Sequence, residues 1–590
     1  MTGAEYIVEF LRQRGVTNIF LVTGGACAFI VDAIGRAEGI SYTCFQHEQS
    51  AAMAADSIWR TNKIVGACVA TSGPGVTNLI TGIATSFFDS IPVVHIAGQV
   101  NQNEGRNYGS AKVRQAGFQE TNIVDMVKPI TKYAVQVHNI QELKFELNKA
   151  YNIALDARMG PVLLDVPMDV QQADAGDFIE FDESLQRFAI SMGKTTETSR
   201  RIQDFIESGT RPLVLLGAGI GLAGVEKEIE NWLVSTNIPF VSSWGGASFF
   251  DHTRTNYCGT IGVYGNRGAN FLIQNCDRLL VLGSRLDNRQ RSGDANSFAK
   301  SARVLVIDVD KEELMKYENN SHYEPGMQMD LFFLPEFLKD VEIPLVSIEW
   351  LSYWKTMRST YLGEHTCQVA EIYGALSPYE CIKSISGILK DDAIVVADTG
   401  ATVCWFFQSF IRTNQTIYTS GGNSPMGYSL PAAIGAAIYN PAKQVVAFIG
   451  DGGMQMNIQE LQTLKHLNLN VTVIIMNNFG YGIIKQFQDS YTDSRYHATG
   501  EGYSTPSFQK IANAYEIKYV CISKAEDIQS NVFNFIGPQI IEVVLHPNTA
   551  IEPKLEMGRS IEDQFPYIPD VEYDGAMKFG KNARKINTSA

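Results

Sequence analysis

The chain has 590 residues, too many for a single core, and at roughly 100–200 residues per domain this length predicts about three to five domains. Apolar residues make up 45% of the chain and charged residues 19%, a composition typical of a soluble globular protein rather than a disordered or fibrous one. The formal net charge of −15 argues against nucleic acid as a partner, because phosphate binding requires clustered Lys and Arg.

The lack of a targeting-signal pattern and the spacing of the cysteines argue against secreted, membrane-spanning, disulfide-rich and zinc-binding proteins. The start, MTGAEYIVEFLRQRGV, has the pattern of an amphipathic helix and lacks the basic-then-apolar order of a signal peptide. No apolar run approaches the ~20 residues needed to cross a bilayer, so we expect a cytoplasmic protein without a membrane partner. The nine cysteines are scattered and never spaced as CxxC, which argues against a disulfide framework and a zinc site; we interpret most of them as core residues.

The first part of the chain predicts an α/β domain. Short apolar runs at 19–24, 64–71 and 91–98 alternate with longer helical stretches, the pattern of a parallel sheet with crossover helices. We expect this domain to cover residues 1–175. The polar stretch around 176–200 predicts a linker.

Two further series of strand-like runs follow. The second series lies at 212–221, 240–243, 278–285 and 303–310, and the third at 393–398, 416–422, 445–450, 471–477 and 539–545. They predict domains at 190–345 and 370–555, with a second linker around 340–372. After about residue 555 the sequence becomes polar and irregular, so we expect 556–590 to be a poorly ordered tail. The predicted fold class is α/β, with three doubly wound parallel-sheet domains.

Residues 445–456, VVAFIGDGGMQM, run from an apolar strand directly into Gly-Asp-Gly-Gly. Such a strand end places Asp451 at the carboxyl edge of the sheet, where α/β folds bind ligands, and glycines there allow close approach of backbone to the ligand. Those glycines are Gly450, Gly452 and Gly453. The helix that follows offers free N–H groups and a partial positive charge to a phosphate.

A second strand, at 471–477, ends on Asn477 and Asn478 and would lie beside the first. Mg²⁺ prefers hard oxygen ligands, which the Asp451 carboxylate, the Asn478 amide and the Gly480 carbonyl can supply. Two unrelated strand-to-turn junctions would explain either half alone. The spaced pair favours a site for magnesium and a diphosphate.

This spaced pair resembles the metal and diphosphate motif of the thiamine diphosphate (ThDP) enzymes. Residues 66–99, GACVATSGPGVTNLITGIATSFFDSIPVVHIAGQ, and 21–29, LVTGGACAF, resemble the pyrimidine-binding domain of the acetolactate synthase branch. The similarity covers about residues 1–560. It implies a pyrimidine-binding, a central flavin adenine dinucleotide (FAD) type and a diphosphate-binding domain, with ThDP and Mg²⁺ as cofactors.

The resemblance also implies roles for individual residues. Glu48, which alone would more often be a helix-start charge, would activate the aminopyrimidine of the cofactor. Met426 would support the bent form of the cofactor, although ordinary core packing is the alternative. Phe118 and Gln119 would lie near the catalytic centre, unless Gln119 is only a polar loop residue. The remaining residues implied to bind cofactor are Gly24, Gly25, Gly450, Gly452, Gly453, Asn477 and Ile483.

The central domain carries a weaker dinucleotide signal. Residues 217–224, GAGIGLAG, lack the third glycine of GxGxxG. Residues 282–290, LGSRLDNRQ, resemble the FAD-contacting segment of acetolactate synthases, which implies that Arg285 and Arg289 lie near FAD, with Asp308 at the next strand end. Flavin does no redox work in the carboligation of that family.

The resemblance implies a carboligase, a transferase that decarboxylates pyruvate and passes the two-carbon hydroxyethyl or acetyl unit to an acceptor carbonyl. A decarboxylase that releases aldehyde is one alternative, but such enzymes commonly place His residues near the cofactor, and beyond His47 no such pair is evident. An inactive regulatory subunit is another, against which Glu48 argues. The family arrangement implies a homodimer or homotetramer in which Glu48 of one subunit faces Asp451 of another.

Two departures leave the acceptor open. The loop between Gln99 and Phe118 is longer than in typical biosynthetic synthases, and Phe487 follows Gln486 where many of them carry the Trp that helps to select the second oxo acid. These features, with the tail at 560–573, look more like a subgroup that passes the acetyl unit to a nucleotide-linked ketosugar. The acceptor is therefore a second 2-oxo acid or such a ketosugar.

Overall fold

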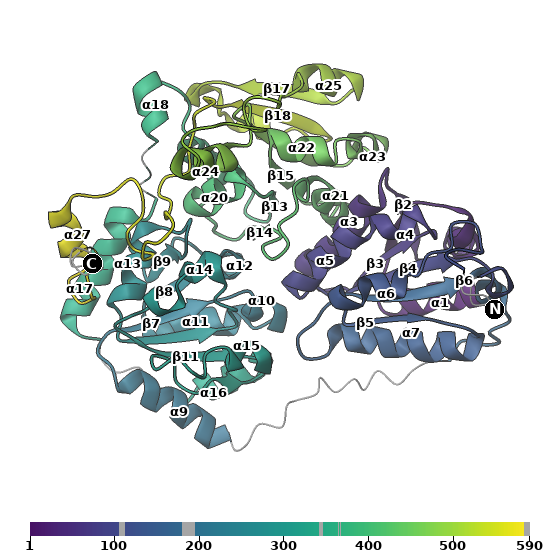
Figure 1. The fold of residues 1–590 in the computed structure, drawn as a ribbon, viewed down its shortest axis with the longest axis horizontal. Helices are drawn as coiled ribbons and strands as arrows, with labels where there is room; N and C mark the ends of the chain where they lie inside the picture. The colour runs from purple at the N-terminus through teal and green to yellow at the C-terminus, as the bar shows by residue number, and fades with distance from the viewer. Residues whose placement is uncertain are drawn as a thin grey trace.

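The computed structural model describes residues 1–105, 113–179, 195–341, 346–363, 365, 367–582 and 584. It contains three six-stranded sheets, and the strand pairings within them are parallel. Helices cover the sheets, and Figure 1 shows the three α/β units side by side, the first in purple, the second in teal and the third in green. This confirms the expected fold class.

The first unit has the strand order β2-β1-β3-β4-β6-β5. Its central strands are buried on both faces, which explains their continuous apolar sequence. Its strands are β1 (Asn18–Leu21), β2 (Ser41–Cys44), β3 (Gly66–Ala70), β4 (Val93–Gln99), β5 (Tyr133–Gln136) and β6 (Val162–Pro167). Its helices are α1 (Gly3–Gln13), α2 (Ala28–Arg36), α3 (Glu48–Asn62), α4 (Pro74–Asn78), α5 (Ile80–Asp89), α6 (Ile123–Val127), α7 (Ile140–Leu155) and α8 (Met168–Gln172).

The central unit has the order β12-β11-β10-β7-β8-β9. Its strands are β7 (Pro212–Leu216), β8 (Phe240–Ser242), β9 (Tyr257–Thr260), β10 (Arg278–Leu282), β11 (Arg303–Asp308) and β12 (Met327–Gln328). Its helices are α9 (Thr195–Glu207), α10 (Gly219–Ala223), α11 (Glu226–Thr236), α12 (Trp244–Ala247), α13 (Arg267–Asn275), α14 (Asn288–Arg291), α15 (Lys311–Met315), α16 (Leu334–Leu338) and α17 (Ile348–Tyr361).

The third unit has the order β14-β13-β15-β16-β18-β17, which places β15 and β16 at the centre of the sheet. Its strands are β13 (Ile394–Ala397), β14 (Thr416–Tyr418), β15 (Val445–Gly450), β16 (Val471–Asn477), β17 (Lys518–Ile522) and β18 (Gln539–Val544). Its helices are α18 (Gln368–Tyr373), α19 (Pro378–Ile388), α20 (Ala401–Ser409), α21 (Ser429–Tyr439), α22 (Asp451–Met456), α23 (Glu460–His466), α24 (Gly482–Tyr491), α25 (Phe508–Ala514) and α26 (Ser530–Phe533).

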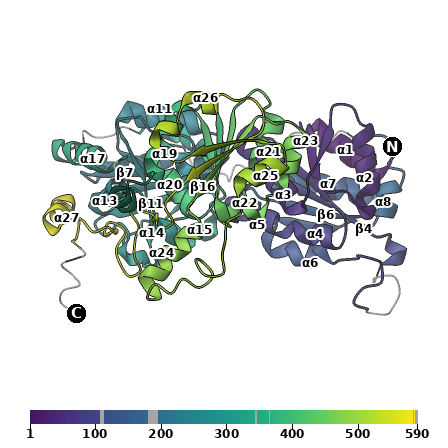
Figure 2. The same ribbon diagram turned by 90° about the horizontal axis from the view of Figure 1, so that it is seen from above.

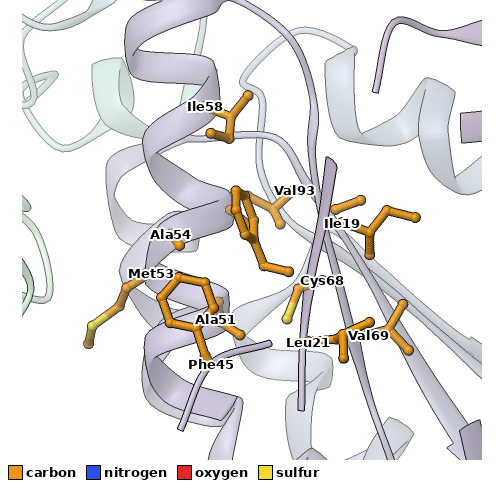
Figure 3. Close-up of a cluster of buried hydrophobic side chains, with 14 of the residues drawn as sticks. Ile19, Leu21, Phe45, Ala51, Met53, Ala54, Ile58, Cys68, Val69 and Val93 are labelled. Atoms are coloured by element: carbon orange, nitrogen blue, oxygen red, sulfur yellow. The ribbon is translucent and has the colours of Figure 1, made fainter. Parts of the chain in front are cut away.

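Helix α3 joins the first and third units. Figure 3 shows its apolar side chains facing Leu21 and Val69 of the first sheet, while Met53 extends from the opposite side of the helix. On that opposite side α3 packs against α21, near the meeting of the two units in Figure 2. A methyl group on Gly435 of α21 would lie 2.6 Å from the Ala54 carbonyl oxygen. Small residues therefore bring the two helices into close contact.

The segment after residue 555 corrects the sequence prediction. It continues into α27 (Asp570–Ala576), which lies beside α13 and α17 in Figure 1. Ile561 and Tyr573 are fully buried in the core of the central unit, and the Gln274 amide donates to the buried Glu562 carboxylate at 2.7 Å. The expectation of a poorly ordered tail is wrong for 556–582, because a few apolar anchors and buried polar pairs fix a sequence that is polar on average.

The predicted linkers are also shorter than expected. Helix α9 already begins at Thr195, while residues 180–194 of the first linker lie outside the described part of the chain. Helix α17 lies within the second predicted linker, and its Trp350 and Trp354 are fully buried in the core of the central unit. That unit therefore extends past the predicted boundary at 345.

Two other expectations can be compared directly with the structure. Seven of the nine cysteines are buried, the exceptions being Cys44 and Cys521, which agrees with their interpretation as core residues. In the described residues, every helix is too short or too polar to span a membrane.

Candidate active site

The two polar strand ends of the third unit lie side by side. Strands β15 and β16 pair in parallel, with Gly450 opposite Met476, so Asp451 and Asn478 emerge from neighbouring strands at the same edge of the sheet. Both side chains are buried, at 2% and 4% exposure. The sequence prediction that these residues meet is confirmed by this register.

Three oxygen atoms converge at this edge. The Asn478 side-chain oxygen lies 3.0 Å from the Gly480 carbonyl oxygen and 3.2 Å from Asp451 Oδ1. With its nitrogen at this position the amide donates to both of these oxygens, and with its oxygen there it completes a set of three oxygen ligands; the two orientations differ by a half-turn of the amide. A carboxylate, an amide and a carbonyl are ligands that Mg²⁺ prefers, and this donor set fits the ion.

The opposite oxygen of Asp451 is held separately. The Tyr503 hydroxyl donates to Asp451 Oδ2 at 2.9 Å and accepts from the Gln455 amide at 3.1 Å. Burial raises the pKa of Asp451 to about 6, and the Tyr503 hydrogen bond opposes that rise. Tyr503 thus leaves Oδ1 facing Asn478 and Gly480. Sequence reasoning missed Tyr503, because it lies far from both motifs in the chain.

The described residues contain no cluster of three or more His, Cys, Asp or Glu side chains able to hold a metal ion. The mixed set of carboxylate, amide and carbonyl is therefore the candidate metal site in the described part of the chain. Its recognition depends on the register of the two strands rather than on a cluster of like ligands.

Glycines allow neighbouring side chains to pack closely against the start of α22. A methyl group on Gly452 would lie 2.5 Å from the Tyr481 ring and 3.3 Å from Met426 Cε, and one on Gly453 would lie 2.9 Å from Asp398 Oδ1. Gly450, Gly452 and Gly453 also line a cavity, which places backbone N–H groups at the start of α22 where a phosphate could bind. Met426 lies directly across from Gly452.

Asp398 fixes the chain on either side of this methionine. Its carboxylate accepts from the backbone N–H groups of Gly427, at 3.0 Å, and Ser429, at 2.9 Å. Burial raises the pKa of Asp398 to about 6. The Asn457 amide also donates to the Gly427 carbonyl, at 2.8 Å. No local sequence pattern pointed to Asp398 or Asn457, because each acts on the backbone of a segment distant in the chain.

A cavity of about 1490 Å³ lies where the three units meet. The predicted residues that line it are Arg285, Arg289, Asp308, Met426, Gly450, Asp451, Gly452, Gly453, Asn478, Gly480 and Ile483. Asn477 is not among its lining residues; instead its amide donates to Glu542 at 2.7 Å and accepts from the Phe479 N–H at 3.0 Å. Asn477 therefore shapes the turn that carries Asn478.

The central unit contributes a backbone-lined wall to this cavity. A methyl group on Gly219 would lie 2.8 Å from Gly283 Cα, so the start of α10 and the loop after β10 touch through their backbones. Beside them Arg285 is half-buried and Arg289 exposed, and the Arg289 guanidinium donates to the Tyr264 hydroxyl at 3.3 Å. Burial raises the pKa of Asp308, at the end of β11, to about 6.

Glu48 belongs to a second, separate group of predicted residues. It opens α3, is 9% exposed, and its Oε2 accepts from the Asn78 amide at 2.9 Å. A methyl group on Gly75 would lie 3.4 Å from the other carboxylate oxygen, Oε1. Glu48 is absent from the lining of the cavity that contains Asp451. Within one chain the two predicted halves of the site are therefore apart.

The other residues predicted for the first domain gather near Glu48. A methyl group on Gly73 would lie 2.8 Å from the Gln119 Cβ, and one on Gly24 would lie 2.5 Å from Thr71. Gln119 has a positive φ of 61°. Gly73 directly precedes α4, whose Gly75 lies next to Glu48. Gly25 lies in open space and Phe118 is 85% exposed.

Comparisons with known proteins agree with this geometry. The chain matches three family models, the N-terminal TPP binding, central and C-terminal TPP binding domains of thiamine pyrophosphate enzymes, over residues 1–126, 199–323 and 398–543. It is 31% identical over 564 residues to the acetolactate synthase isozyme 2 large subunit of Escherichia coli (strain K12), covering 95% of this chain and 98% of that protein. It is also 30% identical over 567 residues to the acetolactate synthase large subunit of Lactococcus lactis subsp. lactis (strain IL1403), covering 94% and 95% of the two chains.

The chain belongs to the acetolactate synthase family of thiamine pyrophosphate enzymes. This confirms the resemblance identified from the motifs around Glu48, Asp451 and Asn478. Thiamine pyrophosphate is the same compound as ThDP. The family models extend over all three α/β units, so the match is not confined to one motif.

Within this family member, the residues predicted to select the acceptor lie on α24. Phe487 is 40% exposed and its ring is 4.8 Å from that of Tyr491. The Gln486 amide is engaged with Ile551, donating to its carbonyl at 2.9 Å and accepting from its N–H at 3.0 Å. Gln486 thus anchors the chain after β18. In the longer loop before Phe118, residues 106–112 lie outside the described residues.

A single methyl group tests the oxygen site. In Gly482→Ala the new Cβ would lie 2.3 Å from Asn478 Nδ2 and would displace the amide. We expect ThDP binding to need about tenfold more Mg²⁺, the size of loss seen when the support of a metal ligand is disturbed. The measurement is a Mg²⁺ titration of ThDP binding followed by intrinsic fluorescence. Gly500→Ala, whose nearest neighbour is 3.6 Å away, is the control; equal Mg²⁺ requirements would contradict the assignment.

Proposed function

We propose that this enzyme decarboxylates pyruvate and transfers the resulting two-carbon unit to an acceptor carbonyl, with ThDP and Mg²⁺ as cofactors. The convergence of three oxygens beside Met426 carries the proposal, because it fits a metal-bound diphosphate next to an apolar support. Membership of the acetolactate synthase family supports the reaction type. The relatives named above are acetolactate synthases.

The third unit would hold the diphosphate end of the cofactor. Asp451, Asn478 and Gly480 would bind Mg²⁺ through the three converging oxygens, and the N–H groups at the start of α22 would bind phosphate oxygens. Met426 would pack against the middle of the cofactor, held in place by Asp398. When bound, ThDP supplies the carbanion and the electron sink for decarboxylation and transfer.

The first unit would supply the proton-handling group. Glu48 Oε2 is occupied by Asn78, which leaves Oε1 to hold a proton at a ring nitrogen of the aminopyrimidine. Because this carboxylate does not line the cavity of its own chain, we propose that it acts on the site of a second copy. A homodimer is then the smallest active unit. The high exposure of Phe118, at 85%, fits a surface that a partner covers.

Two alternatives are less well supported. No feature of the site favours a decarboxylase that only releases aldehyde, and the relatives named above are acetolactate synthases. An inactive regulatory subunit would not need a Glu48 carboxylate held in place by Asn78. Free acetaldehyde as the main product in the presence of acceptors would favour the first alternative.

We also propose that the central unit binds FAD in a structural role. Arg285 and Arg289 could pair with its phosphates, and Asp308 could accept from a ribose hydroxyl, as acidic residues at strand ends do in dinucleotide folds. The close contact between Gly219 and Gly283 fits a wall that a dinucleotide approaches through backbone. These features, rather than the incomplete glycine motif, support the proposal.

The FAD proposal predicts a bound flavin. Purified protein should show flavin absorbance, and adding FAD to flavin-depleted protein should raise its Tm, because a ligand that binds only the folded state stabilises it. Arg289→Ala should weaken both effects. No flavin absorbance together with an unchanged Tm would contradict the proposal without affecting the ThDP site.

The main proposal predicts that Glu48→Gln retains ThDP binding and loses at least a hundredfold in turnover, since proton transfer by a positioned group typically contributes 10²–10⁴-fold. The measurement is release of CO₂ from pyruvate with ThDP and Mg²⁺. Glu38→Gln, the same change at an exposed position of the first unit, is the control.

The same assay identifies the acceptor. Pyruvate is supplied with a panel of 2-oxo acids and nucleotide-linked ketosugars, and products are identified by mass. Absence of CO₂ release by the unaltered enzyme with every acceptor would overturn pyruvate as the donor. An unchanged rate in Glu48→Gln would instead overturn the role of that carboxylate.

A further inference from the structure

The residues around Met426 form a segment, 419–428, that links β14 to α21 and is referred to below as the Met426 segment. Its own domain holds it through Asp398, as described above. A second set of contacts comes from the first unit, more than three hundred positions earlier in the chain. These contacts have no role in the function proposed so far.

Asp89, the last residue of α5, binds the backbone of the segment. Its carboxylate accepts from the N–H groups of Gly421, at 3.0 Å, and Gly422, at 2.7 Å. A methyl group on Gly422 would lie 2.9 Å from Asp89 Oδ1 and 2.6 Å from Phe88 Cβ. The segment therefore approaches α5 as closely as backbone allows.

Arg60, near the end of α3, connects this carboxylate to two further groups. Its Nη2 donates to Asp89 at 2.7 Å, its Nε to Asp56 at 2.6 Å, and its Nη1 to the Thr419 carbonyl at 3.1 Å. The side chain is 11% exposed. All three directions of the guanidinium fork are used, a geometry that Lys cannot reproduce.

Asp56 extends the network to the far end of the segment. It is fully buried, and its carboxylate accepts from the Tyr428 hydroxyl at 2.5 Å and the Ser86 hydroxyl at 3.0 Å. Two carboxylates and one guanidinium are thus buried with most of their hydrogen-bonding positions filled, as buried charges require.

The start of α3 is linked to the same segment through Asn457. The Ser50 hydroxyl donates to Asn457 Oδ1 at 3.2 Å, and the Asn457 amide donates to the Gly427 carbonyl at 2.8 Å. The helix whose first residue is Glu48 therefore contacts the segment on both sides of Met426. Arg60 and Asp89 also line the cavity that Met426 lines.

The first and third units also pack against each other without this polar network. The small residues of α3 and α21 already pack in close contact, with Gly435 against Ala54. The polar network instead concentrates on the backbone of Thr419, Gly421 and Gly422 and on Tyr428. Its contacts thus flank Met426 rather than spread over the interface.

We propose that Asp56, Arg60 and Asp89 are positioning residues that set Met426 against the cofactor from the neighbouring domain. The inference rests on the proposed function, in which Met426 supports bound ThDP. It assigns to the first unit a second task besides presenting Glu48. The helix α3 then serves both halves of the site, through its first residue and through its last two turns.

The test uses the full-length protein and measures ThDP affinity at saturating Mg²⁺ by intrinsic fluorescence, without turnover. Asp89→Asn should weaken ThDP binding about tenfold, the effect expected for loss of a charge-assisted hydrogen-bond pair. Asp32→Asn, the same change at an exposed ion pair of the first unit, should leave the affinity unchanged. Arg60→Lys keeps the charge but not the fork and should weaken binding similarly.

A double-mutant cycle separates positioning from general destabilisation. If Asp89 acts through Met426, then adding Asp89→Asn to Met426→Ala should weaken ThDP binding by much less than tenfold. If the double variant loses ThDP affinity by the full product of the two single losses, the proposal is overturned. It is also overturned if folded Asp89→Asn binds ThDP with unaltered affinity. Failure of both Asp89→Asn and Arg60→Lys to fold would also overturn it, because the network would then hold the domains together. Failure of the proposed function is recognised separately, by absence of ThDP binding or CO₂ release in the unaltered enzyme.

Discussion

Three oxygen atoms that face one another at the ends of β15 and β16 are the constraint on which the rest of the site depends. With the Asn478 amide oxygen turned inward these atoms form a set of hard ligands for a cation, and with its nitrogen inward the amide donates to the other two oxygens. The parallel register of the two strands brings Asp451 and Asn478 together, and Tyr503 turns one oxygen of the carboxylate toward the cation. Everything else around the cavity positions groups relative to this point.

Close packing of small residues provides the second level of organisation. Alanines of α3 and Gly435 of α21 let the first and third units share one core, and this contact brings buried polar groups within reach of the Met426 segment. The same helix begins with Glu48, which does not line the cavity of its own chain. One element therefore supports a site in its own chain and, in the proposed dimer, contributes the carboxylate of another.

The sequence predicted the features that recur as local patterns. Apolar runs gave the three sheets, and the Gly-Asp-Gly and Asn-Asn strand ends located the oxygen site, because parallel strands end at a common edge. Asp398, Tyr503 and Asn457 were not predictable, since each acts through contacts between residues far apart in the chain or through backbone groups. The role of Asn477 in shaping a turn and the burial of Tyr573 in α27 depend on tertiary packing that a polar local sequence hides.

The central claim is that Glu48 and Asp451 of one catalytic site come from different chains. Mixed dimers of Glu48→Gln and Asp451→Ala chains, co-expressed with two tags and purified through both, test it most directly. If each site takes Glu48 from one chain and Asp451 from the other, a mixed dimer contains one intact site and should release CO₂ at roughly half the unaltered rate, although each variant alone is inactive. Mixed dimers as inactive as the single variants would show that both residues of a site belong to the same chain.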